Sequence, residues 1–445
     1  MIDNLLDRIN EYTNNDILIS NGSISRYSDL INKINYYQKN YEKYCPGSKN
    51  TILLKSKLTI DFIALFLVLL KQNNIVVPLN NHSSRNNESI KKISNPDISL
   101  DMDGSLIKSY IVTQKNQHPM KQKLLNQGKS GIILFTSGTS GPPKAILHDA
   151  QLILNKYETK GRKERTLSFM AHDHIGGLNT ILYTLFNGGT LILSESYNAE
   201  RILEQIQKYK VTLLPTTPSF LNMLLLTHNL TNYDLSSLNL ITYGTEPMDK
   251  RTLVRLNELF PDIKFKQTYG MTEIGILSMK SEESSSLEVM IDRSKNDYKI
   301  IDGILFIKSN TSMIGYLNYE SPFTDDGWMN TGDRVVENGD RLIILGRDSE
   351  LINVGGEKVF PIEVENILKE NDSIADASVY ALDNRLLGQI VAADVAPKEN
   401  IDDKKNFIIS IKNYCINRMD RHKVPIKINI VNKIKINERY KKVRI

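Results

Sequence analysis

Cysteine is nearly absent from this chain. The two thiols, Cys45 and Cys415, lie far apart and outside any metal-ligand spacing. Neither a disulfide framework nor a zinc site is therefore expected to organise the fold. So few cysteines favour a reducing compartment, and we expect a cytoplasmic protein.

Long apolar runs and a strong charge of one sign are also missing. The most hydrophobic segment, "FIALFLVLL" at residues 62–70, is bounded by Asp61 and Lys71. A membrane-spanning helix needs about 20 residues, so we expect a buried helix here and no stable membrane insertion. The polar, acidic N-terminal residues 1–15 do not resemble a secretion signal. A net charge of +5 over 445 residues gives no reason to expect nucleic-acid binding.

The chain does contain a regular alternation of short apolar runs and helical segments. Strands are predicted at residues 131–136, 189–194, 211–216 and 239–244, and helices at residues 199–209 and 218–229. This order favours an α/β protein with a parallel sheet, in which ligands gather at the C-terminal ends of strands. Farther along, residues 303–309 and 340–346 suggest antiparallel strands. The length predicts more than one domain.

One loop suggests an anion site. "ILFTSGTSGPPKAILH" (residues 133–148) follows a predicted strand and combines glycines, hydroxyl side chains and Lys144. Glycines allow the backbone to approach an anion, while amides and hydroxyls donate to it. The loop is not the P-loop of nucleotide kinases, because Ala145 follows the lysine and Pro142-Pro143 would interrupt a helix. A Ser/Gly-rich surface turn is the alternative for the loop taken alone.

Three further segments follow in order. "QTYGMTEIG" (residues 267–275) offers an aromatic ring, a glycine, a threonine and a carboxylate, which suit a base, a phosphate and a metal. "WMNTGDRV" (residues 328–335) presents Asp333, a carboxylate able to accept hydrogen bonds from ribose hydroxyls. "LGRDSELINVGGEKVFPIEVE" (residues 345–365) comes next. Each could be a capped turn, but the four in this order indicate one nucleotide site.

With these motifs the chain resembles the adenylate-forming superfamily of acyl-CoA synthetases, non-ribosomal-peptide adenylation domains and luciferases. The resemblance runs from about Ala64 to the C-terminus. It implies an α/β fold: a large N-terminal adenylate-forming domain with mixed sheets and helices (residues 1–345), and a small, mobile α+β C-terminal domain (residues 346–445). A hinge is expected near Asp348.

The resemblance also implies residue roles around ATP, Mg²⁺ and the transferred phosphates. Catalytic roles fall to Lys144, Thr272 at the α-phosphate, Glu273 as the Mg²⁺ ligand and a C-terminal lysine. The group expected around the β- and γ-phosphates is Thr136, Ser137, Gly138, Thr139, Gly141 and Lys144. The group expected around the adenosine and the acyl carboxylate is Gly244, Thr245, Glu246, Tyr269, Asp333 and Arg347, with Tyr269 stacked on the adenine and Asp333 on the ribose.

A lysine near the C-terminus is expected to close over the first step. In "KINERYKKVRI", Lys441 with Arg444 three residues later matches the family's Gly-Lys-x-x-Arg setting, although Tyr440 stands where glycine is usual. Lys442 is the competing choice, and a basic tail exposed to solvent is the alternative without a catalytic role.

The motifs leave more than one choice for the acid substrate and for the thiol that accepts the acyl group. "MAHDHIGGL" (residues 170–178) resembles the His-x-x-Gly-Leu segment of acyl- and aryl-CoA ligases, with His174 at the matching position and Gly270 also near the acyl and thiol pocket. His174 could equally be a core residue. Amino-acid-activating enzymes usually carry an aspartate near this place, and Asp173 keeps that alternative open. Gly355 and Gly356 would let a pantetheine arm pass, whether it belongs to CoA or to a carrier protein.

Three hypotheses follow. The first is an acid–CoA ligase for a fatty, aromatic or o-succinylbenzoate-like acid, with ATP, Mg²⁺ and CoA. The second is a stand-alone adenylating enzyme that loads an acyl or amino acid onto the phosphopantetheine of an acyl carrier protein. The third is a non-catalytic nucleotide-binding relative, which the presence of Lys144, Glu273, Asp333 and a C-terminal lysine disfavours.

Overall fold

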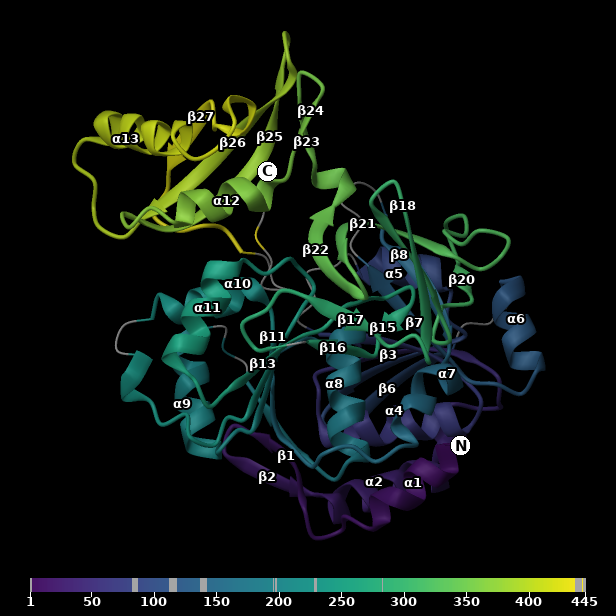
Figure 1. Ribbon diagram of the computed structural model, residues 1–445. Coiled ribbons are helices and arrows are strands. Elements are labelled where there is room, and N and C mark those ends of the chain that lie inside the picture. Colours follow the sequence, from purple (N-terminus) through teal and green to yellow (C-terminus); the bar gives the residue numbers. More distant parts are fainter. Residues whose placement is uncertain are drawn as a thin grey trace.

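Two seven-stranded sheets organise the large N-terminal part of the chain. The computed structural model describes residues 2–81, 87–111, 118–136, 142–194, 196, 198–227, 230–281, 283–436 and 442. Figure 1 shows the layers of this part and the smaller C-terminal part above it. Among the described residues, no helix has the length and apolar character that a membrane crossing requires.

The first sheet has the strand order β20-β8-β7-β4-β3-β5-β6. Its central strands β7, β4, β3 and β5 run parallel, and β8, β20 and β6 are antiparallel to their neighbours. The strands are β3 (Thr51–Ser56), β4 (Ile75–Asn80), β5 (Ile98–Asp103), β6 (Leu106–Ile111), β7 (Gly131–Thr136), β8 (Lys144–Asp149) and β20 (Gly315–Tyr316). The helices between β3 and β8 in sequence are α4 (Ile60–Lys71), α5 (Asn87–Ser94) and α6 (Pro119–Asn126).

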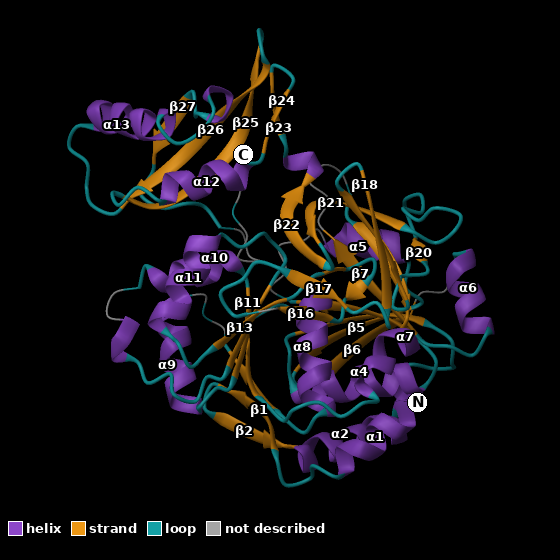
Figure 2. Cartoon of the chain, in the orientation of Figure 1, coloured by secondary structure: helices purple, strands orange, loops and turns teal. Residues whose placement is uncertain are grey.

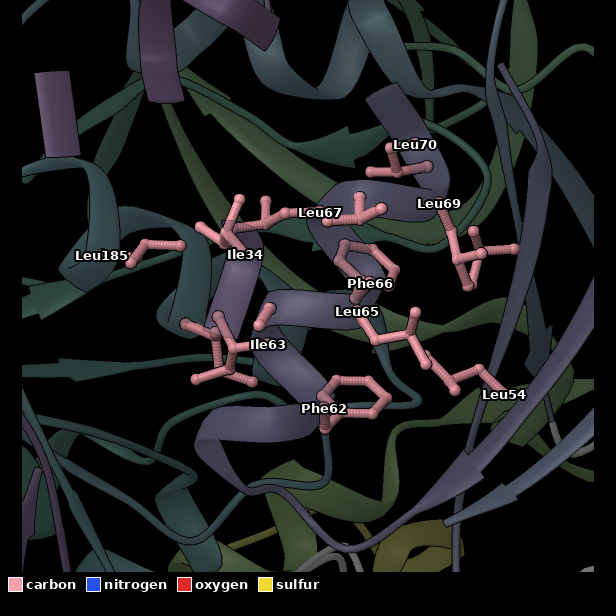
Figure 3. Packing of buried hydrophobic residues seen from close by; sticks show 14 of the residues in the cluster. Ile34, Leu54, Phe62, Ile63, Leu65, Phe66, Leu67, Leu69, Leu70 and Leu185 are labelled. Atoms are coloured by element: carbon pink, nitrogen blue, oxygen red, sulfur yellow. The ribbon is translucent and has the colours of Figure 1, made fainter. Parts of the chain in front are cut away.

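Helix α4 is the apolar segment noted in the sequence. The Thr59 hydroxyl caps it by accepting a hydrogen bond from the amide of Phe62. Residues 61–70 are all buried, and Figure 3 shows the side chains of α4 surrounded by other apolar residues, among them Ile34 and Leu185. The prediction of a buried helix is thus confirmed. Five more helices contribute to the same core: α1 (Ile2–Asn10), α2 (Tyr27–Lys39), α3 (Tyr41–Tyr44), α7 (Ala150–Leu154) and α8 (Ile175–Phe186).

The second sheet has the order β13-β12-β11-β9-β10-β1-β2 and is parallel except for β2. Its strands are β1 (Asp16–Ser20), β2 (Ser23–Arg26), β9 (Arg165–Ser168), β10 (Thr190–Leu193), β11 (Leu213–Thr216), β12 (Leu240–Tyr243) and β13 (Lys264–Gln267). Figure 1 shows α9 (Ala199–Tyr209), α10 (Pro218–Leu225) and α11 (Lys250–Leu259) beside β11 and β13, and all three helices share one apolar core with this sheet.

The predicted elements are largely present, and one predicted helix is shorter than expected. Residues 131–136 form β7, but this strand belongs to the first sheet, whereas the other three predicted strands are parallel neighbours in the second. Four similar apolar runs thus divide between two sheets, because strand pairing and not composition assigns a strand to its sheet. The helix predicted over residues 218–229 ends at Leu225, where Leu226 closes the last turn. Helix α9 has the predicted bounds.

A third, antiparallel sheet follows in the order β16-β17-β22-β21-β19-β18. It is built from β16 (Met279–Ser281), β17 (Val289–Ile291), β18 (Asn296–Ile301), β19 (Ile304–Ser309), β21 (Met329–Asn338) and β22 (Arg341–Arg347). The expected antiparallel strands near residues 303–309 and 340–346 are β19 and β22. The short hairpin of β14 (Gly270–Met271) and β15 (Gly275–Ile276) precedes this sheet in the sequence.

The C-terminal part has its own sheet and core. β24 (Glu357–Val359), β23 (Ile352–Val354), β26 (Gly388–Pro397) and β25 (Ile374–Asn384) form the sheet, and β27 (Lys427–Ile430) pairs with β26. Helices α12 (Pro361–Lys369) and α13 (Lys404–Ile416) share one apolar cluster with these strands. Figure 2 shows both helices against this sheet, separate from the helices of the larger part.

Candidate functional site

The glycine-rich loop connects two antiparallel strands. Thr136 ends β7, Lys144 begins β8, and these two residues are paired across the hairpin. The chain therefore turns back into a strand, which agrees with the absence of a P-loop helix. The predicted phosphate contacts Ser137, Gly138, Thr139 and Gly141 lie outside the described residues, so their roles stay predictions.

Lys144 lies against two aromatic rings. Its ammonium is 5.0 Å from the ring centroid of Tyr316 and 5.3 Å from that of Tyr319. The hydroxyl of Tyr316 donates a hydrogen bond of 2.8 Å to Oε1 of Glu273. The predicted phosphate lysine and the predicted metal ligand thus share one buried tyrosine, a contact that sequence reasoning missed. Tyr316 lies far from both in the sequence, and no local pattern marked it.

A tight hairpin sets the position of Thr272 and Glu273. Strands β14 and β15 flank them, with Gly270 opposite Ile276 and Met271 opposite Gly275. A Cβ on Gly270 would lie 2.5 Å from the carbonyl oxygen of Gly275, so only glycine fits there. Gly270 therefore acts in the backbone of the hairpin, and its predicted place near the acyl and thiol pocket stays a prediction.

His148 holds this hairpin from β8. Its Nε2 lies 2.7 Å from the carbonyl oxygen of Thr272, and the side chain is fully buried. Burial lowers the pKa of His148 to about 4, although the bond to Thr272 opposes that shift. The ring is therefore neutral near pH 7 with its proton on Nε2, because a carbonyl can only accept. Sequence reasoning missed this residue, and a histidine four positions after Lys144 on a buried strand was the available signal.

Tyr269, Asp333 and Arg347 meet, although their sequence positions are distant. The Tyr269 hydroxyl donates to Oδ2 of Asp333 over 2.6 Å, and Nε of Arg347 lies 2.9 Å from Oδ1. Arg347 also donates to the carbonyl of Thr331. Burial first and the Asp333 carboxylate second raise the pKa of Tyr269 well above its usual value, so it remains a donor. The predicted ribose carboxylate is thus held from both sides.

The segment after β12 contains a strained residue. A Cβ on Gly244 would lie 2.4 Å from the carbonyl oxygen of Thr268. Thr245 has φ +73°, which is a left-handed conformation that a β-branched residue rarely adopts. Glu246 accepts a 3.0 Å hydrogen bond from the amide of Ser219, in the first turn of α10. Such strain is typical of functional segments.

The three residues before α8 differ in exposure. His172 and Asp173 are buried, and Asp173 accepts a 3.4 Å hydrogen bond from the amide of Asn80. The His172 ring lies 4.4 Å from that of Phe62, and burial lowers the pKa of His172 to about 4. His174 occupies the N-cap position of α8 and is partly exposed.

The remaining predicted residues lie toward the C-terminal part. Gly355 and Gly356 form the turn between β23 and β24, both with positive φ. Asp348 accepts a 2.6 Å hydrogen bond from Nε of Arg334 on β21. Lys441 lies outside the described residues.

Lys442, the competing lysine, is buried in an acidic setting. Its Nζ is 2.7 Å from Asp376 and 3.7 Å from Glu365, and it donates to the carbonyl of Ala377. Burial disfavours its charge, but the Asp376 and Glu365 carboxylates outweigh burial and raise the pKa of Lys442 above its ordinary value.

A pocket between the two parts is lined by charged groups of both. Lys369 on α12 forms a 2.5 Å ion pair with Asp249, the N-cap of α11. The lining residues are Pro218, Ser219, Asn222, Glu246, Pro247, Asp249, Ile362, Glu365, Lys369 and Lys442. Glu246 of the predicted site and Lys442 therefore border the same space.

Sequence models of one enzyme family match both parts of the chain. A sequence model described as AMP-binding enzyme matches residues 68–316, and one described as AMP-binding enzyme C-terminal domain matches residues 363–441. The first match covers more than half of the chain, so the protein belongs to the AMP-binding enzyme family. This confirms the family inferred from the motifs.

The named relatives include a CoA ligase and an acyl-CoA synthetase. The chain is 30% identical over 297 residues to 4-coumarate-CoA ligase 1 of Narcissus pseudonarcissus, covering 58% of this chain and 54% of that relative. It is 26% identical to acyl-CoA synthetase 7 of Caenorhabditis elegans, covering 80% and 72%. The alignment with the Narcissus ligase thus spans about half of that protein. These names agree with the expected class of AMP-forming ligase.

Solved structures confirm the fold class, with its large N-terminal and small C-terminal domains. An anthranilate CoA ligase in complex with anthranoyl-AMP gives a TM-score of 0.82 at 17% identity, covering 99% of this chain and 95% of that one. The o-succinylbenzoate CoA synthetase of Bacillus subtilis gives 0.74 at 19% identity, covering 99% and 96%.

Proposed function

We propose that the protein is an AMP-forming acid–CoA ligase. In the first step a carboxylate oxygen of the acid attacks the α-phosphorus of ATP, which forms an acyl-adenylate and releases pyrophosphate. In the second step the CoA thiol attacks the acyl carbon, gives up its proton, and displaces AMP. Membership of the AMP-binding family and the names of the relatives support ATP and CoA as co-substrates.

One observation carries the proposal: Tyr316 joins Lys144 and Glu273. Both reactants of the first step are anionic, so the reaction needs positive charge at the phosphate oxygens. Lys144 supplies part of that charge directly, and the amide and hydroxyl groups of residues 136–141 would donate to the departing pyrophosphate. Loss of one such contact costs roughly 10² to 10³ in rate.

Glu273 suits a magnesium ion that arrives with ATP. Among the described residues, no group of three or more His, Cys, Asp or Glu side chains could hold a metal by itself. Mg²⁺ in phosphoryl-transfer enzymes usually binds one or two carboxylates together with substrate phosphates, and one buried carboxylate fits that donor set. Bound there, Mg²⁺ would neutralise charge on the phosphates. Thr272 would contact the α-phosphate beside it.

The pair of Asp333 and Tyr269 suits the nucleoside. A carboxylate has about four lone-pair sites, so Asp333 can accept from ribose hydroxyls while Tyr269 and Arg347 hold it. Tyr269 would then present its ring to the adenine, and Gly244 to Glu246 would border the base and the acyl carboxylate.

Lys441 is the lysine we assign to the first step. Lys442 is occupied by Asp376 and Glu365, and removing it would leave Glu365, itself 1% exposed, without this cation. We expect Lys441→Ala to abolish acid-dependent ATP–pyrophosphate exchange. We expect Lys442→Ala to lower the melting temperature. Exchange at the wild-type rate in Lys441→Ala would remove Lys441 from the mechanism.

The acid is proposed to lack an α-amino group. Asp173, the residue that could pair with a substrate ammonium, is buried and accepts from the Asn80 amide. His174 at the start of α8 would line the acyl pocket, which suits a fatty, aromatic or o-succinylbenzoate-like acid. A cytoplasmic location is proposed because both cysteines are buried free thiols.

A pyrophosphate-release assay over a panel of acids, with and without CoA, tests the function. Release followed by CoA-thioester formation supports the ligase, with the turn at Gly355 and Gly356 passing the pantetheine. Release without thioester formation would favour loading of a carrier protein. No release with any acid would contradict the proposal and favour a non-catalytic nucleotide-binding role.

A further inference from the structure

A five-residue segment with no assigned role lies against the start of β8. Gly315–Tyr316 forms β20, and Tyr316 pairs with Ile146 while Gly315 pairs with Leu147. The amide of Leu317 then donates to the carbonyl of Ala145 over 2.9 Å. The segment "GYLNY", residues 315–319, thus follows β8 back to Lys144, and we call it the GYLNY clamp.

The clamp holds the backbone on both sides of Lys144. Nδ2 of Asn318 donates to the carbonyl of Pro143 over 3.0 Å, and Oδ1 of Asn318 accepts from the amide of Ala145 over 2.9 Å. The Tyr319 hydroxyl donates to the carbonyl of Pro142 over 3.0 Å. One asparagine therefore bonds to the residue before the lysine and to the residue after it.

The clamp also orients the side chain of Lys144. The rings of Tyr316 and Tyr319 meet edge to face at 72°, with centroids 6.2 Å apart, and the ammonium lies 5.0 and 5.3 Å from these centroids. A cation over an aromatic face is attracted by the ring quadrupole. This attraction does not use up the three N–H donors of the ammonium, which can all turn to phosphate oxygens.

Tyr316 reaches the second catalytic group through its hydroxyl. The bond to Oε1 of Glu273 is 2.8 Å, and the Tyr316 side chain is buried. Burial first and the nearby Glu273 second raise the pKa of Tyr316, so the hydroxyl keeps its proton and donates. The single bond orients the carboxylate and leaves further lone pairs for a metal.

We propose that Tyr316 is a positioning residue that couples the phosphate-binding lysine to the metal-binding carboxylate, and that Asn318 and Tyr319 complete its hold on Lys144. This inference rests on the proposed function. Groups that are oriented before ATP arrives need no reorganisation when charge develops on the phosphates. The clamp therefore serves the first step by setting Lys144 and Glu273 relative to each other.

Tyr316→Phe separates the contact with Lys144 from the bond to Glu273, because the ring stays and the hydroxyl is lost. A hydrogen bond to a charged group contributes enough for about a tenfold change in an equilibrium constant. We expect about tenfold more Mg²⁺ to be needed for half-maximal acid-dependent pyrophosphate exchange. Calorimetry should give about a tenfold weaker Kd for ATP with Mg²⁺ and an unchanged Kd for ATP without it. Unchanged Mg²⁺ dependence in both measurements overturns the proposal.

Tyr380→Phe is the matched control. Its hydroxyl donates to Asp394 over 3.1 Å in the C-terminal sheet, so the variant also loses a tyrosine–carboxylate bond. Its Mg²⁺ dependence should equal that of the wild type. The same Mg²⁺ shift in Tyr380→Phe would show a general loss of structure and would also overturn the proposal.

Tyr319→Leu removes one ring from Lys144 and leaves Glu273 untouched. We expect about threefold weaker binding of ATP whether or not Mg²⁺ is present, from the loss of one cation–π contact. Tyr319→Phe keeps the ring and should recover most of that affinity. A shift in Mg²⁺ dependence in Tyr319→Leu equal to that in Tyr316→Phe would contradict separate roles for the two rings.

The binding measurements also distinguish failure of the clamp from failure of the proposed function. A wild-type protein that binds ATP with Mg²⁺ but releases no pyrophosphate with any acid rejects the ligase reaction, and the calorimetric comparison of variants still tests the clamp. A wild-type protein that does not bind ATP overturns both. If the wild type is active and Tyr316→Phe has the same Mg²⁺ dependence as the wild type, only the proposal on the clamp is overturned.

Discussion

His148 should make the folded protein sensitive to mild acid. Its pKa falls from the usual 6.5 to about 4 because burial disfavours the imidazolium beside the Thr272 carbonyl. The unfolded chain therefore binds a proton between pH 6.5 and pH 4 that the folded chain does not. The free energy of unfolding is highest above pH 6.5 and decreases as the pH falls through this window.

The size of the effect follows from the shift. At roughly 1.4 kcal/mol per pKa unit, the lower pKa of His148 in the folded chain decreases the free energy of unfolding by about 3 kcal/mol at pH 4 and below. About 2 kcal/mol of this would already be lost at pH 5. Because the His148 side chain is fully buried, solvent does not screen its charge, and the whole pKa shift acts on stability.

His148→Gln is the test variant, since its amide can still donate to Thr272 but does not titrate. Urea unfolding followed by circular dichroism should be measured for wild type and variant at several pH values from 7 to 5. The stability difference between the two proteins should shift in favour of the variant by about 2 kcal/mol over that range. His172, whose pKa burial also lowers to about 4, would stay in both proteins and cancel in the comparison. A difference independent of pH would refute the assignment of a neutral, buried imidazole.

Three further predictions concern strain, the inter-domain contact and the thiols. Thr245→Gly should leave the free energy of unfolding unchanged or raise it by up to about 1 kcal/mol, because the strain of a left-handed threonine is relieved while the flexible glycine costs entropy. A clear loss of stability in a thermal melt would mean that contacts of the Thr245 side chain impose the conformation. Lys369→Met leaves the buried Asp249 without its cation and should cost about 3 kcal/mol, seen as faster hydrogen exchange in α12 and at the start of α11; unaltered exchange there would contradict the structural role of this ion pair. Burial raises the pKa of Cys45 to about 12 and of Cys415 to about 11, so a disulfide reagent at pH 7 should label both far more slowly in the native than in the unfolded protein; equal rates would contradict their burial.

Local pattern was sufficient for the parts of the fold whose cause is local. The run at residues 62–70 predicts α4 because nine apolar, buried positions in a row leave no exposed face. The Thr-Gly turn before Asp333 and the ring at Tyr269 likewise mark residues that the structure brings into contact. Their chemistry is visible in the sequence.

Contacts between distant strands could not be predicted in this way. The apolar run of β7 resembles those of β10 to β12, and its sheet is decided by pairing with β4 through Ile75 and Gly131. His148 and Tyr316 look like ordinary residues of a strand and a loop, because their partners Thr272 and Glu273 are brought near only by the packing of separate sheets. The position of His148 on a buried strand near Lys144 could single that residue out, but a single sequence does not indicate which distant residue will be its partner.

The partners of the three proposed catalytic residues Lys144, Thr272 and Glu273 share one physical property. The observed contacts of Lys144 and Glu273 come from aromatic rings and a tyrosine hydroxyl, and Thr272 is held by a neutral imidazole. An opposite charge in direct contact would compete with phosphate or metal, whereas an uncharged partner orients a charge and leaves it available. In contrast, Lys369 and Asp249 neutralise each other between the two domains, which suits a structural contact and not a ligand site. Lys144 and Glu273 are thus held by neutral groups, whereas Asp333, the carboxylate proposed for the ribose, is paired with Arg347. Neutral partners therefore distinguish the two charges proposed to meet phosphate and metal from the structural pair of Lys369 and Asp249.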